Sequence, residues 1–174
     1  MSTIPYDLTR IRAFVFDVDG VLSPNVVAVG PDGNPARMAN VKDGYAMQLA
    51  RKHGYRLAII SGADSETVRR RFELLGIEDV FMRVSDKRPV LESWMARNGL
   101  DPETVSYVGD DVPDIPCLDA VGLPVVPADA SVDAKNHALY VSPLCGGMGI
   151  ARELIEQTMR AQGEWLNLKT AFGW

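Results

Sequence analysis

The sequence predicts a doubly wound α/β domain, in which helices cover both faces of a parallel sheet. Short runs rich in β-branched residues alternate along the chain with amphipathic stretches, and this alternation is typical of parallel sheets. Acidic residues directly follow two of the apolar runs, at the strand ends where ligands bind in open α/β sheets. The length of 174 residues suits a single domain that comprises residues 1–174.

Each apolar run is short enough to be a buried strand. The expected strands are 12–17, 56–60, 104–108 and 123–126. The expected helices are 44–53, 65–75, 88–98, 114–120 and 149–162. Right-handed crossovers connect such strands in a parallel sheet.

The segment from about 25 to 41 interrupts this alternation. The turn sequence Pro31-Asp32-Gly33 lies between the stretches 26–29 and 36–41, which predicts an inserted β-hairpin. The hairpin is too small to be a separate cap domain. Because its outward face would otherwise be exposed to water, we expect it to serve contacts between subunits.

The composition excludes several classes of protein. The 18 basic and 23 acidic residues give a net charge of −5, and there is no basic stripe for nucleic acid. No apolar run approaches the roughly 20 residues that span a bilayer, and the first ten residues lack the apolar stretch of a secretory signal. The two cysteines cannot form a disulfide framework or a multi-cysteine metal site. We therefore expect a cytoplasmic protein with no nucleic-acid or membrane partner.

Two groups of aspartates follow expected strands. Asp17 and Asp19 stand at the carboxyl end of the first expected strand, and Asp110, Asp111 and Asp114 follow the third. So many like charges around one site are costly unless a cation offsets them, and clustered carboxylates favour a hard ion such as Mg²⁺. The alternatives are two solvated aspartates in a turn and an Asp-rich helix cap.

Two weaker signals lie between these groups. Ser61-Gly62 follows the second expected strand, where a hydroxyl and backbone N–H groups can bind phosphate or simply cap a helix. Lys87 stands at an expected helix start, and a single lysine there is usually a surface residue. Lys87 becomes a candidate site residue because it follows Ser61 and precedes the second aspartate group along the chain.

That order resembles the haloacid dehalogenase superfamily of phosphotransferases, over about residues 12–162. The sequences FDVDGVL at 16–22, NVKDG at 40–44 and Gly-Gly-Met-Gly at 146–149 are similar to its capless subfamily. The best-known members hydrolyse 3-deoxy-D-manno-octulosonate 8-phosphate and related sugar-acid phosphates. The resemblance implies a Rossmann-like sheet with an inserted hairpin and no cap domain.

The resemblance also implies a Mg²⁺-dependent phosphomonoester hydrolase. Asp17 would be the nucleophile that forms an aspartyl-phosphate, and Asp19 would be the general acid and base. Asp17, the backbone carbonyl of Asp19 and Asp110 would bind Mg²⁺. Ser61, Gly62 and Lys87 would bind the phosphoryl group.

Other residues are given supporting roles. Asp114 would orient Lys87 or the water shell of the metal, and Asp111 would help the site or cap a helix. Lys42, Asp43 and Gly44 are expected in a loop facing the pocket, as substrate or phosphate contacts or as a hairpin exit and helix cap.

Two positions depart from the subfamily pattern. Ala63 and Met148 stand where its members usually have arginine, and guanidinium groups bind a sugar-acid carboxylate in a bidentate manner. One or two of Arg69, Arg70 and Arg71 could face the pocket instead. The phosphate chemistry is therefore better supported than the identity of the sugar.

The last residues, about 164–174, contain three aromatic side chains, Trp165, Phe172 and Trp174. The subfamily forms homotetramers in which the hairpins meet and each C-terminal tail approaches a neighbouring active site, so we expect the same here; the alternative is a disordered end.

The function predicted by the resemblance is hydrolysis of 3-deoxy-D-manno-octulosonate 8-phosphate in lipopolysaccharide precursor synthesis. The alternatives are another sugar-acid or small phosphate, such as a nonulosonate 9-phosphate, and a non-catalytic scaffold. Loss of Asp17, Asp19, Lys87 or Asp110 would favour the scaffold, but all four are present.

Overall fold

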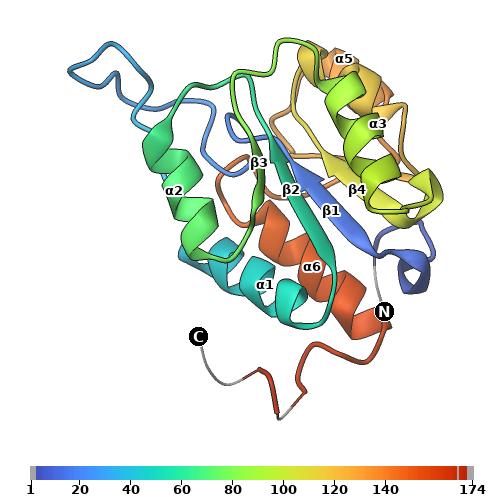
Figure 1. The fold of residues 1–174 in the computed structure, drawn as a ribbon. Coiled ribbons are helices and arrows are strands. Elements are labelled where there is room, and N and C mark those ends of the chain that lie inside the picture. Colours follow the sequence, from blue (N-terminus) through green and yellow to red (C-terminus); the bar gives the residue numbers. More distant parts are fainter. Residues whose placement is uncertain (1–2, 168, 172–174) are drawn as a thin grey trace.

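A six-stranded parallel sheet forms the centre of the computed structural model, which describes residues 3–167 and 169–171 (Figure 1). The strand order is β3-β2-β1-β4-β5-β6, and every adjacent pair is parallel. The strands are β1 (Ala13–Phe16), β2 (Arg56–Ile60), β3 (Asp79–Phe81), β4 (Val105–Val108), β5 (Leu123–Val126) and β6 (Tyr140–Val141). This arrangement confirms the predicted doubly wound α/β fold.

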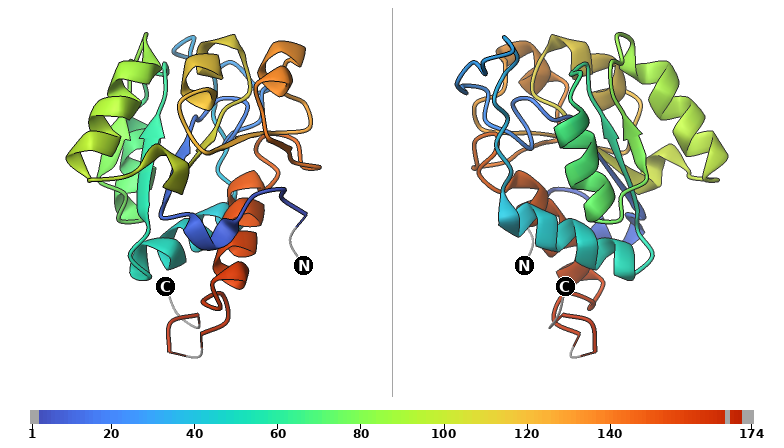
Figure 2. Two further views of the ribbon diagram at one scale, coloured as in Figure 1. Left: turned by 90° about the vertical axis from the view of Figure 1, so that its right-hand side faces the viewer. Right: turned by 60° about the vertical axis from the view of Figure 1, so that its left-hand side comes forward.

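Six α-helices lie on the two faces of the sheet (Figure 2). They are α1 (Val41–Lys52), α2 (Glu66–Leu74), α3 (Lys87–Arg97), α4 (Ile115–Leu118), α5 (Val132–Asn136) and α6 (Ile150–Ala161). Short 3-10 helices are η1 (Leu8–Arg10), η2 (Pro102–Thr104) and η3 (Val112–Asp114). No helix of the described residues is long and apolar enough to cross a membrane.

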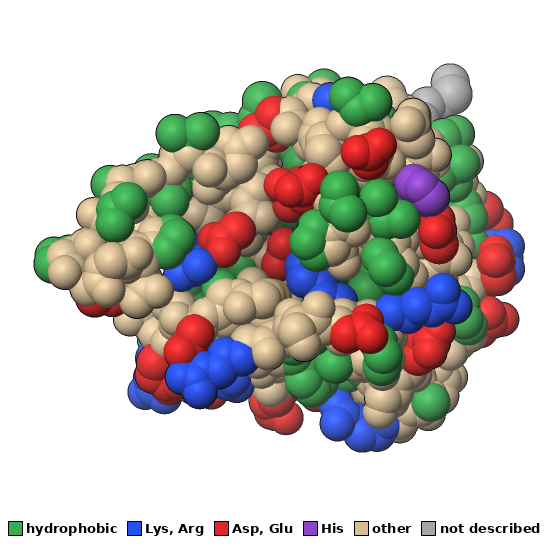
Figure 3. All heavy atoms as spheres, turned by 90° about the horizontal axis from the view of Figure 1, so that it is seen from above, with side chains coloured by type: hydrophobic (Ala, Val, Ile, Leu, Met, Phe, Trp, Pro, Cys, Tyr) green, Lys and Arg blue, Asp and Glu red, His purple; other side chains and the backbone are tan. Residues whose placement is uncertain are grey.

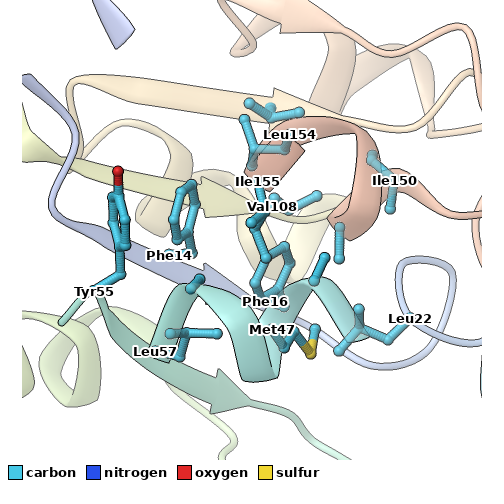
Figure 4. Close-up of a cluster of buried hydrophobic side chains, with 14 of the residues drawn as sticks. Phe14, Phe16, Leu22, Met47, Tyr55, Leu57, Val108, Ile150, Leu154 and Ile155 are labelled. Carbon is cyan, nitrogen blue, oxygen red and sulfur yellow. The ribbon is translucent and has the colours of Figure 1, made fainter. Parts of the chain in front are cut away.

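The alternating side chains of β1 divide the core into two parts. Phe14 and Phe16 point to one face, where they pack with residues of α1 and α6 such as Met47 and Leu154 (Figure 4). Ala13 and Val15 point to the other face, against α3, α4 and α5. Both faces of a parallel strand are therefore buried, which explains the continuous apolar run in the sequence.

The sequence patterns missed the edge strands β3 and β6, helix α5 and the 3-10 helices η1 and η2. The edge strands β3 and β6 have three and two residues, and α5 has five. A period of two or of 3.6 residues is not visible over so few positions. The predicted helix 114–120 is also shorter than expected, since α4 ends at Leu118 and Asp114 is the last residue of the 3-10 helix η3.

The predicted hairpin projects from the body of the fold (Figure 2). Its turn is present, since Gly30 N donates to the carbonyl of Asn34 at 2.7 Å. The pairing beyond the turn is limited to one antiparallel bridge, between Val29 and Pro35. The hydrogen bond from Ala36 N to the carbonyl of Ala28, at 2.8 Å, lies on the other side of this bridge from the turn.

Helix α1 begins three residues earlier than predicted. The side chain of Asn40 accepts hydrogen bonds from the backbone N–H of Lys42 and Asp43, at 2.9 and 3.4 Å, and so caps the helix. Its Nδ2 also donates to the carbonyl of Gly147 at 3.2 Å. Asn40 therefore joins the start of α1 to the glycine-rich loop before α6.

The described part of the C-terminal tail packs on its own chain. Trp165 is buried, and the guanidinium of Arg152 lies 4.4 Å from the centre of its ring. Tyr45 OH donates to the carbonyl of Ala171, and His53 Nε2 lies 2.8 Å from Thr170 Oγ1. Phe172 and Trp174, the other two aromatic residues of the tail, lie outside the described residues.

Replacing Asn40 by alanine should destabilise the protein by about 1–2 kcal/mol, because the helix loses its N-cap. We expect the melting temperature to fall by roughly 2–8 °C. The matched control is Asn34→Ala, because the Asn34 side chain bonds only to Asp32 in the exposed turn. Equal melting temperatures for the two variants would show that the Asn40 cap contributes nothing.

Candidate active site

Three of the predicted site residues follow neighbouring strands. Asp17, Ser61 and Asp110 come after β1, β2 and β4, which are adjacent in the sheet. The carboxyl ends of parallel strands meet at one edge, so the order of the sheet brings these residues together. Figure 3 views the molecule from above and shows acidic side chains next to basic ones in the middle of that face.

A chain of buried ion pairs lies at the centre of the site. Lys87 Nζ lies 2.9 Å from Asp17 Oδ2 and 2.7 Å from Asp114 Oδ1. All three side chains are less than one-tenth exposed. Lys87 is the first residue of α3, so the helix start delivers the ammonium group to the end of β1. Asp114 was predicted to orient either Lys87 or the water shell of the metal. In the structure it contacts Lys87.

Asp114 is held by four hydrogen bonds. Its Oδ1 accepts from Lys87 Nζ and from the hydroxyl of Tyr107, both at 2.7 Å. Its Oδ2 accepts from the backbone N–H of Asp110 at 3.0 Å and of Asp111 at 3.4 Å. Tyr107 was not singled out from the sequence, because it lies within an apolar strand and reads as core.

Two glycines allow the acidic loops to approach closely. A Cβ on Gly20 would lie 2.0 Å from Asp110 Oδ2, and Gly20 has a φ of +75°. A Cβ on Gly109 would lie 2.4 Å from the Cβ of Asp114. Any side chain at these positions would displace a site carboxylate.

Three carboxylates form a cluster suited to a metal ion. One oxygen each of Asp17, Asp110 and Asp114 lies within 4.8 Å of the others. Burial, and then the charge of Asp114, raise the pKa of Asp17 to about 6. Burial and the charges of Asp114 and Asp17 raise the pKa of Asp110 to about 7. Burial lowers the pKa of Lys87, but the charges of Asp17 and Asp114 outweigh it and raise that pKa.

The donor set fits a hard cation. Asp17 Oδ1 is buried and has no hydrogen-bond partner among the described residues, so it is available to a ligand. A bound cation would offset the repulsion that raises the pKa values of Asp17 and Asp110. The cluster contains only carboxylate oxygens, the ligands that Mg²⁺ prefers.

Asp19 points its side chain toward an arginine of the projecting segment. Arg37 Nε and Nη2 donate to the two oxygens of Asp19, at 2.7 and 2.8 Å. The Asp19 side chain is thus outside the carboxylate cluster. Arg37 was missed because the residues around it give no sign that the hairpin folds back onto Asp19.

Ser61 and Gly62 lie in the loop after β2. Ser61 is buried, and its Oγ accepts a hydrogen bond from the N–H of Ala63 at 3.1 Å. Gly62 is exposed. Met148, the second position without the usual arginine, is also exposed, at 56%.

Lys42, Asp43 and Gly44 lie in the first turn of α1, not in a loop as predicted. Lys42 is exposed, whereas Asp43 and Gly44 are buried. Asp43 Oδ1 accepts from the backbone N–H of Arg152 at 2.7 Å, so Asp43 satisfies a free donor at the start of α6. Burial raises the pKa of Asp43 to about 6. Asp111 is exposed at the start of η3.

Comparison with known proteins agrees with this geometry. The pattern of the haloacid dehalogenase-like hydrolases matches residues 40–128. The 3-deoxy-D-manno-octulosonate 8-phosphate phosphatase KdsC of Salmonella typhimurium is 36% identical over 163 residues, 92% of this chain and 87% of the relative.

Solved structures are also similar. The Moraxella catarrhalis phosphatase of that name, in complex with a magnesium ion, a phosphate ion and KDO, has a TM-score of 0.88 and 28% identity, covering 96% of each chain. A cobalt-bound deoxy-D-mannose-octulosonate 8-phosphate phosphatase from Haemophilus influenzae has a TM-score of 0.88 and 29% identity, covering 96% of this chain and 99% of that one.

The parallel sheet, the acidic loops and the buried lysine define a phosphatase of the haloacid dehalogenase superfamily. No cap domain interrupts the described residues. Within this superfamily, the chain belongs to the capless family of 3-deoxy-D-manno-octulosonate 8-phosphate phosphatases.

Asp110→Asn should raise the melting temperature of the metal-free protein, and by more at about pH 7.5 than at about pH 5. The folded pKa of Asp110, about 7, lies above its unfolded value. Between the ordinary pKa of 3.8 and about 7, the folded state therefore binds more protons than the unfolded state, and the contribution of Asp110 to stability falls as the pH rises through that window. The asparagine side chain at position 110 has no charge, so the variant does not lose stability in this way as the pH rises.

We expect the two gains to differ by at least roughly 2 °C in thermal unfolding with a chelator present. Asp133→Asn is the matched control, because Asp133 is exposed and outside the cluster. Equal gains at both pH values would contradict a repulsive carboxylate cluster.

Proposed function

We propose that this chain hydrolyses 3-deoxy-D-manno-octulosonate 8-phosphate with Mg²⁺, as a step of lipopolysaccharide precursor synthesis in a bacterial cytoplasm. The observation that carries the proposal is the buried contact of Lys87 with Asp17, beside an Asp17 oxygen that has no partner. The substrate is suggested by the names of the relatives, one of whose structures contains magnesium, phosphate and KDO.

In the first step, a carboxylate oxygen of Asp17 attacks phosphorus and the bond from phosphorus to the sugar oxygen breaks. Asp19 donates a proton to that oxygen as it leaves. Arg37 fixes the direction of the Asp19 carboxylate through two hydrogen bonds. The product of this step is an aspartyl-phosphate on Asp17 and a free sugar acid.

In the second step, Asp19 takes a proton from a water molecule that attacks phosphorus. The bond between phosphorus and Asp17 breaks, so inorganic phosphate leaves and the carboxylate is restored. Ser61 Oγ, the N–H of Gly62 and the ammonium of Lys87 would bind the phosphoryl oxygens in both steps.

Asp17, Asp110 and the backbone carbonyl of Asp19 would hold Mg²⁺, which when bound screens the repulsion between the carboxylate and the phosphate. Asp114 keeps Lys87 in place through the hydrogen bond at 2.7 Å. Asp111 would support the metal site from the loop after β4. Lys42, exposed at the start of α1, would contact the substrate.

Asp17→Asn should abolish phosphate release, because the amide cannot form the acyl-phosphate. The test measures phosphate release with Mg²⁺ from a panel of sugar and sugar-acid phosphates. It includes the octulosonate 8-phosphate and a nonulosonate 9-phosphate. A wild-type circular dichroism spectrum and a cooperative thermal transition of the variant control for folding.

The expected result is selective hydrolysis of the octulosonate phosphate by the wild type and none by the variant. Turnover by the variant would contradict the assignment of Asp17. Preference for the nonulosonate phosphate would contradict the substrate, and no turnover of any phosphate would favour a scaffold.

We further propose that the chain forms a homotetramer through the segment 25–41. Val26 and Val29 are 85% and 76% exposed on it, so the segment offers apolar side chains that a second copy could cover. We expect the double variant Val26→Asp, Val29→Asp to have a lower molar mass than the tetrameric wild type by light scattering. A wild type of monomeric mass would contradict the assembly.

The tail is proposed to approach a neighbouring active site in that tetramer. Its described residues pack on α1 and α6 of their own chain. Truncation after Gly163 should change the KM or kcat of the tetramer, and unchanged kinetics would contradict a role for the tail.

A further inference from the structure

The carboxylate of Asp114 belongs to the acidic cluster, yet groups of the protein already occupy its acceptor sites. One of its oxygens lies within 4.8 Å of an oxygen of Asp17 and of Asp110. A carboxylate offers about four acceptor sites, and Asp114 accepts two hydrogen bonds on each oxygen. By contrast, Asp17 Oδ1 is buried without a hydrogen-bond partner among the described residues. The two carboxylates therefore differ in what they can offer a cation.

Three of the four donors to Asp114 are fixed by the backbone or by the buried ion pairs. Two are the backbone N–H groups of Asp110 and Asp111, in the loop after β4. The third is the ammonium group of Lys87. The fourth is the hydroxyl of Tyr107, which lies 2.7 Å from Asp114 Oδ1. A change from tyrosine to phenylalanine would remove this donor alone.

The ring of Tyr107 fills the core, and packing alone does not require its hydroxyl. Tyr107 is fully buried in the half of the core that faces α3, α4 and α5, and its partner in register on β1 is Val15. Phenylalanine has the same ring, whereas a buried hydroxyl is costly unless it has an acceptor. The bond to Asp114 therefore accounts for a tyrosine at this position.

Loss of the hydroxyl would open one acceptor site of Asp114 to a cation. Asp114 Oδ1 would then accept only from Lys87 Nζ. The cluster of Asp17, Asp110 and Asp114 carries more negative charge than Lys87 offsets, so it favours binding of a further cation. A metal ion and the ammonium group would therefore compete for the same oxygen.

We propose that Tyr107 is a positioning residue, whose hydroxyl occupies the last acceptor site of Asp114 and so keeps this carboxylate on Lys87 and away from the metal ion. The inference rests on the proposed function, in which Asp17 and Asp110 hold Mg²⁺ and Lys87 binds the phosphoryl group. Tyr107 contacts neither of these ligands and acts only through Asp114. The hydroxyl thus decides which of two neighbouring cations Asp114 serves.

The variant Tyr107→Phe tests this role, and Tyr140→Phe is its matched control. Tyr140 is also a buried tyrosine of the sheet, in β6, and its hydroxyl donates to a carboxylate oxygen of Glu153 at 2.5 Å. The control therefore loses the same kind of hydrogen bond away from the acidic cluster. A wild-type circular dichroism spectrum and a cooperative thermal transition show that each variant folds.

The first measurement is calorimetric titration of the metal-free proteins with magnesium chloride. Tyr107→Phe should bind Mg²⁺ more tightly than the wild type, by roughly 10-fold or more, because a hydrogen bond to a charged group is lost and its acceptor becomes available to the cation. Tyr140→Phe should match the wild type. A merely structural role for Tyr107 predicts a change of opposite sign, because a loosened cluster would bind Mg²⁺ more weakly.

A double-mutant cycle tests whether Tyr107 acts through Asp114. In an Asp114→Asn background, the charge that the hydroxyl would release to the metal is absent. Adding Tyr107→Phe to this background should therefore leave the affinity for Mg²⁺ unchanged, within roughly a factor of two. The same tightening in both backgrounds would show that Tyr107 acts by another route and would overturn the proposal.

Kinetics with the octulosonate phosphate add a second readout. At saturating Mg²⁺, kcat of Tyr107→Phe should fall by roughly 10- to 100-fold, because Asp114 no longer holds Lys87 in place. If the wild type hydrolyses no phosphate, the proposed function fails, and the calorimetry still tests Tyr107. Weaker or unchanged binding of Mg²⁺ by Tyr107→Phe, or an equal change in Tyr140→Phe, would overturn the role of the hydroxyl.

Discussion

Burial of the Lys87 ammonium between Asp17 and Asp114 is the interaction on which the site depends. Each of the three groups is less than one-tenth exposed, so each would be very costly to bury alone. Lys87 offsets only part of the negative charge, because Asp110 adds a further carboxylate to the cluster. The remaining negative charge makes this end of the sheet suitable for binding a cation. A buried cluster with that net charge would be unfavourable as a purely structural core.

The fold supplies the means to hold these charges. Adjacent strands β1 and β4 bring the two acidic loops together, and the start of α3 brings the lysine. Gly20 and Gly109 permit carboxylates to pack directly on the backbone. The Tyr107 hydroxyl and two backbone N–H groups donate to the Asp114 carboxylate and fix its position. Asp114 in turn orients the Lys87 ammonium.

The sequence was sufficient to predict the parts of the site that follow continuous apolar runs. Asp17, Ser61 and Asp110 could be placed together, since the ends of parallel strands share an edge. The contacts made by segments without regular structure could not be predicted. The bond of Arg37 to Asp19 depends on how the segment 25–41 folds back, and only one bridge orders that segment.

The same holds for residues whose partners lie far along the chain. Asp43 was expected at a pocket from its neighbours in the sequence, yet it also satisfies the start of α6, more than 100 residues away. Helical spacing alone left Arg69, Arg70 and Arg71 as alternatives. The surroundings of α2 distinguish them, because Arg69 and Arg70 are engaged elsewhere.

The most direct test of the central claim, that Asp17 is the nucleophile, is to locate the phosphoryl group on the protein. The Asp19→Asn protein would be mixed with Mg²⁺ and the octulosonate phosphate, quenched in acid and digested for tandem mass spectrometry. A phosphoryl group on the peptide that contains Asp17, at that residue, is the expected result. Phosphorylation at another residue, or turnover at the wild-type rate with no adduct, would contradict the role of Asp17 or of Asp19.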